Sequence, residues 1–195
     1  MMSSTPEQKA NGHPVVPSMQ RLTTQYLDVE DRIRITGATT NGEAIVIWLT
    51  QRLLTRLLPH LLTQLQTQTA SSAAVSTDAV QTEMVQTFAQ QAARAQLPEQ
   101  APVKVLPESQ SWLAESIDVT TKKADESNQD QVIKFLFKGI NKELASVTMP
   151  STQLRQWLNI LHDQWLLSAW PMSLWPDWVT ESVPARGVKS QISLH

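Results

Sequence analysis

Side chains able to do chemistry are few in this chain, and none stands in a spacing that catalysis or metal binding requires. The four histidines are His13, His60, His162 and His195. Two of them, His60 and His162, fall on predicted amphipathic helices beside leucines, without a second metal ligand three or four residues away. We expect both to be boundary residues of their helices rather than ligands or bases.

The acidic segment 125–130 is the remaining candidate for a cation site. A calcium-binding loop needs a glycine at its sharp turn and a bidentate acid at its last position. Here Asp130 and Leu136 occupy those positions, which excludes such a loop. The 5 glycines stand singly and build no phosphate loop, and the absence of cysteine removes thiol and iron–sulfur chemistry. We therefore predict no catalytic, cofactor or metal residues and no cofactor, leaving open only a site assembled from scattered Asp, Ser and His side chains.

Charge offers little support for a nucleic-acid surface. The chain has 16 basic and 18 acidic residues, a net charge of −2. Pairs of basic residues recur on predicted strand and helix faces: Arg32 and Arg34, Lys134 and Lys138, Arg52 and Arg56. Acidic residues stand beside the first pair, and no aromatic residues interleave with the cations for base stacking. A solvated face is the favoured interpretation, with weak nucleic-acid binding kept as the third choice.

Tryptophan gives the strongest pointer to function. Trp157 and Trp165 have the spacing of a helix core, whereas three more follow in the proline-interrupted segment 168–178. Rigid aromatic side chains held on such a segment are typical anchors of protein interfaces. The predicted partner-binding residues are Trp170, Met172, Leu174, Trp175 and Trp178. The alternative is that the segment folds back and buries its rings within the same molecule.

Hydrophobic periodicity supplies the elements that must position these residues. It predicts an α+β fold with an antiparallel sheet and amphipathic helices packed on it. The expected strands are 27–37, 43–49, 112–121, 131–138 and 143–149, with a short edge strand considered at 103–106. The expected helices are 51–67, 78–97 and 151–168.

The last strands and helix repeat the first ones at a constant offset of one hundred residues. The matches include Ile33 with Ile133, Leu54 with Leu154 and Leu58 with Leu158. We interpret them as two internally repeated strand–turn–strand–helix (ββα) units, about 27–67 and 131–168. Unrelated amphipathic units whose apolar patterns happen to agree are the alternative. Under duplication, the leucines of the first helix and their counterparts in the second should be equally buried.

The domain organisation follows from these elements. We expect a disordered N-terminal lead over 1–20 and a single α+β domain over 21–168, whose two units are joined by helix 78–97 and strand 112–121. A Trp/Pro-rich segment and tail, 169–195, completes the chain. Neither a signal peptide nor a membrane-spanning run is evident, which indicates a soluble cytoplasmic protein of bacterial type.

The favoured function is a non-catalytic protein–protein interaction module: an adaptor, assembly factor or oligomeric scaffold. Its expected partner is another protein or a second copy of the chain, not a membrane, and nucleic acid is disfavoured. The alternative is a small-molecule binder or enzyme that uses a cleft between the two ββα lobes.

Overall fold

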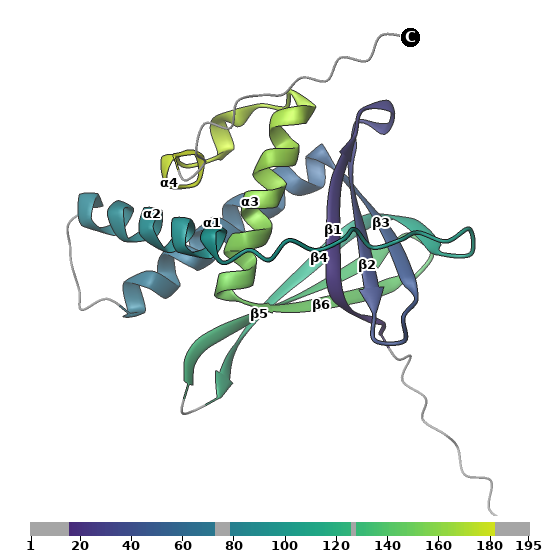
Figure 1. The fold of residues 1–195 in the computed structure, drawn as a ribbon, viewed down its shortest axis with the longest axis horizontal. Helices are drawn as coiled ribbons and strands as arrows, with labels where there is room; N and C mark the ends of the chain where they lie inside the picture. Colours follow the sequence, from purple (N-terminus) through teal and green to yellow (C-terminus); the bar gives the residue numbers. More distant parts are fainter. Residues whose placement is uncertain (1–15, 73–78, 126–127, 182–195) are drawn as a thin grey trace, which may run out of the picture.

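A computed structural model describes residues 16–72, 79–125 and 128–181. In these ranges the chain forms a six-stranded barrel with helices gathered on one side of it (Figure 1). The first half contains β1 (Ser18–Leu27), β2 (Arg32–Thr39), β3 (Ala44–Thr50), α1 (Gln51–Ser72) and α2 (Ala79–Ala95). The second half contains β4 (Gln110–Asp125), β5 (Asn128–Gly139), β6 (Leu144–Pro150), α3 (Ser151–Ser168) and α4 (Asp177–Thr180). The short 3-10 turns η1 (Asp28–Glu30) and η2 (Met172–Leu174) follow β1 and precede α4.

The α+β class is confirmed, but the sheet is mixed rather than antiparallel as predicted. The strands follow the order β1-β2-β3-β4-β5-β6 around a closed barrel. Each group of three consecutive strands is antiparallel, whereas β3 pairs with β4, and β6 with β1, in parallel. A parallel pair needs a long crossover connection, and α1 and α2 supply it between β3 and β4. The apolar pattern identifies strands but not the direction in which distant ones meet.

The second and third strands of both halves pair in the same register at positions one hundred residues apart. Ile33 pairs with Leu49 in the first half, and Ile133 with Met149 in the second. The turns match as well. Gly42 and Lys142 both have positive φ angles, 81° and 68°, which the tight turn between these strands requires.

Two predicted boundaries are wrong. The strand expected over 27–37 is the end of β1 and most of β2, separated by η1 and by Asp31 in the left-handed region. The expected lead over 1–20 is too long, because β1 begins at Ser18 and Met19 is buried. Residues 1–15 lie outside the described part. The edge strand considered at 103–106 does not form, although Val103 is buried and its N–H donates to Thr23 Oγ1 at 2.8 Å.

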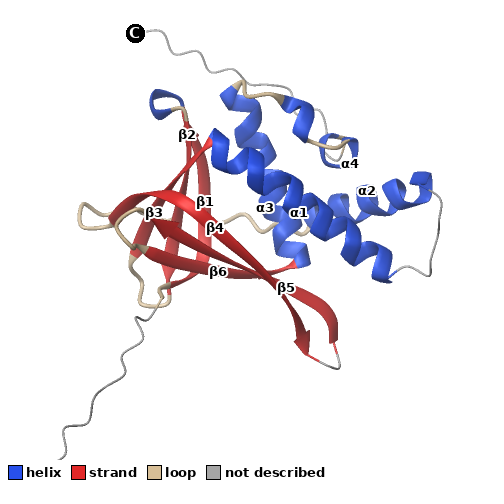
Figure 2. Cartoon of the chain, turned by 180° about the vertical axis from the view of Figure 1, so that it is seen from behind, coloured by secondary structure: helices blue, strands red, loops and turns tan. Residues whose placement is uncertain are grey.

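The core lies between the barrel and the helices that cover it (Figure 2). As predicted, the leucine rows of α1 and α3 are equally buried. Each of these six side chains is at most 1% exposed: Leu54, Leu58, Leu61, Leu154, Leu158 and Leu161. No helix in the described ranges is long and apolar enough to cross a membrane.

Candidate functional site

The tryptophans of the predicted partner-binding segment are buried by their own chain. Trp170 and Trp175 are each 6% exposed and Trp178 is 2% exposed. The ring of Trp165, at the end of α3, lies edge to face against Trp170 at 5.0 Å and against Trp175 at 5.6 Å. The fold-back alternative therefore describes where the three rings lie. Rings in this position leave little surface for a partner.

The other two residues of the predicted set lie at the margin of this cluster. Met172 and Leu174, both in η2, are half-buried and pack against the core. They retain surface that a second molecule can contact, so their partner-binding role stays a prediction.

His162 lies inside the tryptophan cluster. Its side chain is 3% exposed and packs edge to face on Trp175, with 5.0 Å between the ring centres. Burial lowers its pKa, the Asp163 carboxylate acts in the opposite direction, and Arg94 adds to the lowering. The imidazole is thus kept neutral and serves packing. His60 is exposed on α1, and no group of three potential metal ligands occurs in the described ranges.

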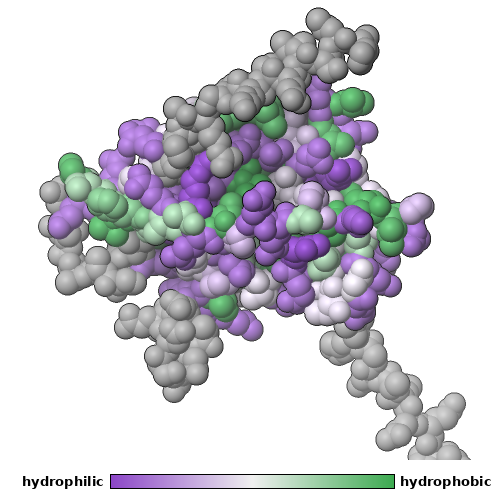
Figure 3. Space-filling model, in the orientation of Figure 1, coloured by the Kyte–Doolittle hydropathy of each residue, from purple (hydrophilic) through white to green (hydrophobic). Residues whose placement is uncertain are grey.

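The helix α2 buries its polar face and exposes its apolar face, the inverse of what its sequence pattern predicts. This inversion is the least expected feature of the molecule. An apolar stripe normally marks the buried face of a helix. Here the buried side chains are Gln86, Gln90 and Ala93. The apolar residues point outward: Val80 and Phe88 are each 65% exposed and Met84 is 53% exposed. Figure 3 shows this apolar colour running along α2.

Arg155 explains why the glutamines face inward. This arginine, on α3, is 6% exposed and lies over the Trp178 ring at 5.5 Å. Its guanidinium donates to Gln86 Oε1 at 2.6 Å and to Gln90 Oε1 at 3.3 Å, and the Gln90 amide donates to the Arg155 carbonyl at 2.9 Å. Burial lowers the pKa of Arg155 to about 10, so it remains charged at neutral pH. A buried cation needs such hydrogen bonds, and α2 supplies them by turning its polar face inward.

The stripe on the outer face of α2 is therefore an exposed apolar surface. Val80, Met84 and Phe88 are four residues apart, which places them in one row along the helix. Glu83 is the only charged residue between Ala79 and Gln91. An apolar row of this size on a helix surface is typical of a protein contact.

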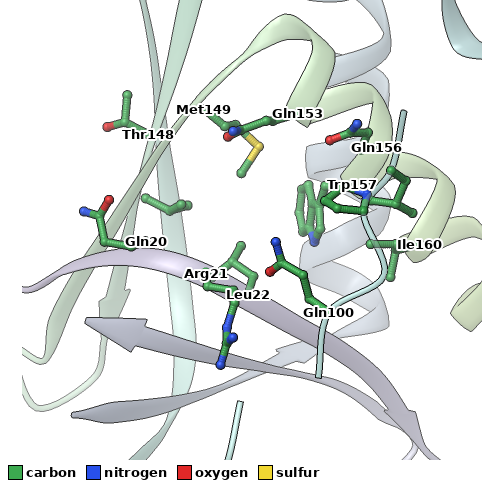
Figure 4. Close-up of a pocket in the computed structure, with 13 residues that line it drawn as sticks. Gln20, Arg21, Leu22, Gln100, Thr148, Met149, Gln153, Gln156, Trp157 and Ile160 are labelled. Atoms are coloured by element: carbon green, nitrogen blue, oxygen red, sulfur yellow. The ribbon is translucent and has the colours of Figure 1, made fainter. Parts of the chain in front are cut away.

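A cavity of about 270 Å³ lies where β1 and β6 separate, so it is bounded by both halves of the chain. Figure 4 shows Met149 and Gln100 pointing toward its middle, while the Arg21 guanidinium points away. Trp157 and Ile160 of α3 also line it. Apart from Arg21, the polar lining side chains are uncharged: Gln20, Gln100, Thr148, Gln153 and Gln156. The described residues of this lining thus offer hydrogen bonds and apolar contacts.

A second groove lies between α1 and β4. Its helix residues precede four residues of the first cavity by one hundred positions: Leu53, Arg56, Leu57 and His60 match Gln153, Gln156, Trp157 and Ile160. Ile117 and Val119 form its other wall. The two grooves are thus placed alike but differ in chemistry.

Three of the six basic residues singled out in the sequence, Arg32, Arg34 and Lys138, contact side chains of their own chain. Arg34 donates to Gln25 at 2.8 Å and lies 6.0 Å from the Trp48 ring centre. Lys138 pairs with Asp118 at 2.6 Å. These contacts fit the solvated face that the sequence predicts.

Comparison of the chain with protein-family models, curated proteins and solved structures found no match. Function must therefore follow from the geometry. The amino-acid sequence alone indicated neither the outer face of α2 as a candidate surface nor Arg155 as the residue that orients this helix. The only signal was local: Gln86 and Gln90 are one turn apart on a helix of low charge.

Proposed function

We propose that this protein is a non-catalytic protein–protein interaction module, of the adaptor, assembly-factor or oligomeric-scaffold kind, whose contact surface is the outer face of α2. The observation that carries the proposal is the inversion of that helix. Its apolar row lies in solvent while its glutamines hold a buried arginine. Exposing such side chains costs free energy, which a partner covering them recovers.

The partner that fits this face best is a second copy of the chain. The row is symmetric about Met84, because Val80 precedes it and Phe88 follows it by the same four residues. In an antiparallel pair of identical helices, Met84 meets its own copy, and Phe88 packs on Val80 of the other helix. The single charge between Ala79 and Gln91, at Glu83, opposes this approach little.

Light scattering after size-exclusion chromatography tests this proposal. Because the row is only two helical turns long, we expect a reversible dimer whose fraction grows with concentration. The double substitution Met84→Glu and Phe88→Glu should abolish it. As a matched control, the pair Gln66→Glu and Gln110→Glu adds the same charge at exposed positions of α1 and β4, outside α2. A wild-type chain that stays monomeric at the highest attainable concentration contradicts self-association.

We also infer that the scaffold arose from two copies of one unit, of the form βββα rather than ββα. The matching registers, turns and groove positions at an offset of one hundred residues support this inference. Truncation of equivalent buried leucines, Leu58→Ala and Leu158→Ala, should each cost about 2–5 kcal/mol in unfolding free energy. If the two substitutions lower the unfolding free energy by amounts that differ by most of this range, the two leucines do not occupy equivalent positions.

A further inference from the structure

The cavity between β1 and β6 lies at a gap in the hydrogen bonding of the barrel wall. The two strands pair only at Ser18 with Ser146 and at Met19 with Val147. Beyond these residues they separate, and α3 lies across the opening. The opening therefore has the edge of a strand on each side.

Backbone groups of both strands face this opening. The Tyr26 N–H donates to Gln164 Oε1 of α3 at 2.8 Å, so the backbone N–H of Tyr26 points away from β2. In an antiparallel ladder every second residue has its backbone groups on the same side. The β1–β2 ladder is regular from Arg21 to Leu27, so the backbone groups of Leu22 also point away from β2. On β6, the Ser146 N–H donates to the Pro17 carbonyl at 2.8 Å. The backbone N–H of Thr148, two residues later, points to the same side and therefore into the gap.

One side chain of α3, Gln164, already acts as a partner of the β1 backbone farther along the strand. The Trp157 indole N–H also reaches β1, but it donates to a side chain, Thr24 Oγ1, at 3.0 Å. In the described part of the chain, no residue takes this role at Leu22, which lines the cavity instead. Unpaired strand edges are templates for another extended chain.

We propose that this cavity binds an extended, uncharged peptide segment of another protein by strand addition to the edge of β1. The backbone of Leu22 pairs with the peptide. Carboxamides such as Gln100 and Gln153 carry both donors and acceptors and satisfy the remaining peptide groups. One aliphatic side chain of the peptide enters the cavity between Met149 and Trp157. This site is separate from the outer face of α2 and does not depend on it.

The absence of charge inside the cavity sets the kind of peptide. Among the described residues no acidic side chain lines it, and the one cation that does, Arg21, is exposed and points away (Figure 4). A charged side chain entering the cavity would lose its hydration without gaining an ionic partner. An apolar side chain has no such hydration to lose, and the burial of its surface favours binding.

The test is a titration of the full-length, ¹⁵N-labelled chain with the blocked peptide acetyl-Thr-Val-Leu-Val-Thr-amide. We expect saturable shifts of the Leu22 and Thr148 amides and of the Trp157 indole, with a Kd on the order of 1 mM. A second peptide, acetyl-Thr-Pro-Leu-Pro-Thr-amide, keeps the leucine but removes two backbone donors. It should bind at least about tenfold more weakly if the contact is a strand ladder.

A filled cavity provides the matched variant. Gln100→Trp places an indole where the peptide leucine should lie, and should weaken binding by roughly tenfold or more. Gln96→Trp makes the same change at an exposed position outside the cavity and should bind as the unchanged chain does.

Three results overturn the proposal. One is the absence of shifts at these residues even when the peptide concentration exceeds the expected Kd, about 1 mM, several-fold. Another is equal binding of the two peptides, which indicates an apolar pocket without strand addition. The third is binding only after residues 1–14 are removed, which assigns the opening to this chain's own N-terminal segment.

Discussion

The indole N–H of Trp170 donates a 2.7 Å hydrogen bond to Asp31 Oδ1, a carboxylate 139 positions earlier in the chain. The same oxygen accepts the Tyr26 hydroxyl at 2.9 Å, and the Tyr26 and Trp170 rings meet edge to face at 5.6 Å. Desolvation, followed by the hydrogen bond to Asp31, raises the pKa of Tyr26. The tryptophan segment is thereby tied to the turn after β1. It belongs to the fold of the monomer.

Replacing the Asp31 carboxylate by an amide should weaken this tie. Asparagine tolerates the left-handed backbone at this position, where φ is 46°, so Asp31→Asn changes little else. We expect a loss of about 1 kcal/mol in unfolding free energy, because both hydrogen bonds lose their ionic acceptor. Urea unfolding followed by tryptophan fluorescence measures it. Asp28→Asn, on the same turn, is the control, and equal effects of the two changes would argue against the tie.

Removal of a ring from the tryptophan cluster should destabilise the monomer itself. Trp178 is 2% exposed, so Trp178→Ala leaves a cavity and should cost about 3–5 kcal/mol. Leu174→Ala, at a half-buried position, should cost less. Calorimetry of both variants distinguishes the two roles that the sequence leaves open for this segment. If Trp178→Ala is as stable as the unchanged chain, the ring does not stabilise the monomer, and the interface interpretation of this segment is favoured again.

The buried glutamines of α2 should matter far more than their exposed neighbour. Gln90→Leu removes an acceptor from the buried Arg155 guanidinium and should cost about 2 kcal/mol. Gln91→Leu changes the next, exposed residue in the same way and should stay within about 0.5 kcal/mol. Chemical unfolding of the two variants gives the comparison. Similar costs would mean that the arginine network does not orient α2.

Acidification should destabilise the tryptophan cluster through His162. Its pKa is lowered in the folded chain, so the unfolded chain binds its proton first as the pH falls. Stability is therefore complete above the ordinary histidine pKa, about 6.5, and is lost as the pH drops toward the lower folded value. Thermal unfolding at about pH 7.5 and about pH 5.5 measures this loss. His162→Gln should reduce the pH dependence and His60→Gln should leave it unchanged; the reverse would exclude His162 as the cause.

The sequence predicts those parts of the fold that local periodicity determines. Helix α3 has the expected bounds, and β5 and β6 lie within a few residues of theirs, because apolar spacing and the turn at Gly139 specify them. Barrel closure is different, since the pairing of Ser18 with Ser146 joins residues that no local pattern relates.

The candidate site was harder to predict for a similar reason. The spacing of Val80, Met84 and Phe88 identifies a helix but not the direction in which its apolar face points. That direction depends on Arg155, more than sixty residues later, whose burial demands polar partners. Likewise, the cluster of Trp170, Trp175 and Trp178 is evident in the sequence, whereas the surface that covers it is not.

The most direct test of the outer face of α2 uses the absence of cysteine in the natural chain. A single cysteine introduced by Met84→Cys can form a disulfide only between two copies. If the symmetric pairing is right, the two thiols meet at the symmetry axis, and mild oxidation should convert most of the chain to covalent dimer. The control is Val29→Cys, at a position that is 97% exposed and far from the row in sequence. Symmetric pairing predicts faster dimer formation at position 84 than at position 29. Equal, slow crosslinking at both positions would contradict it.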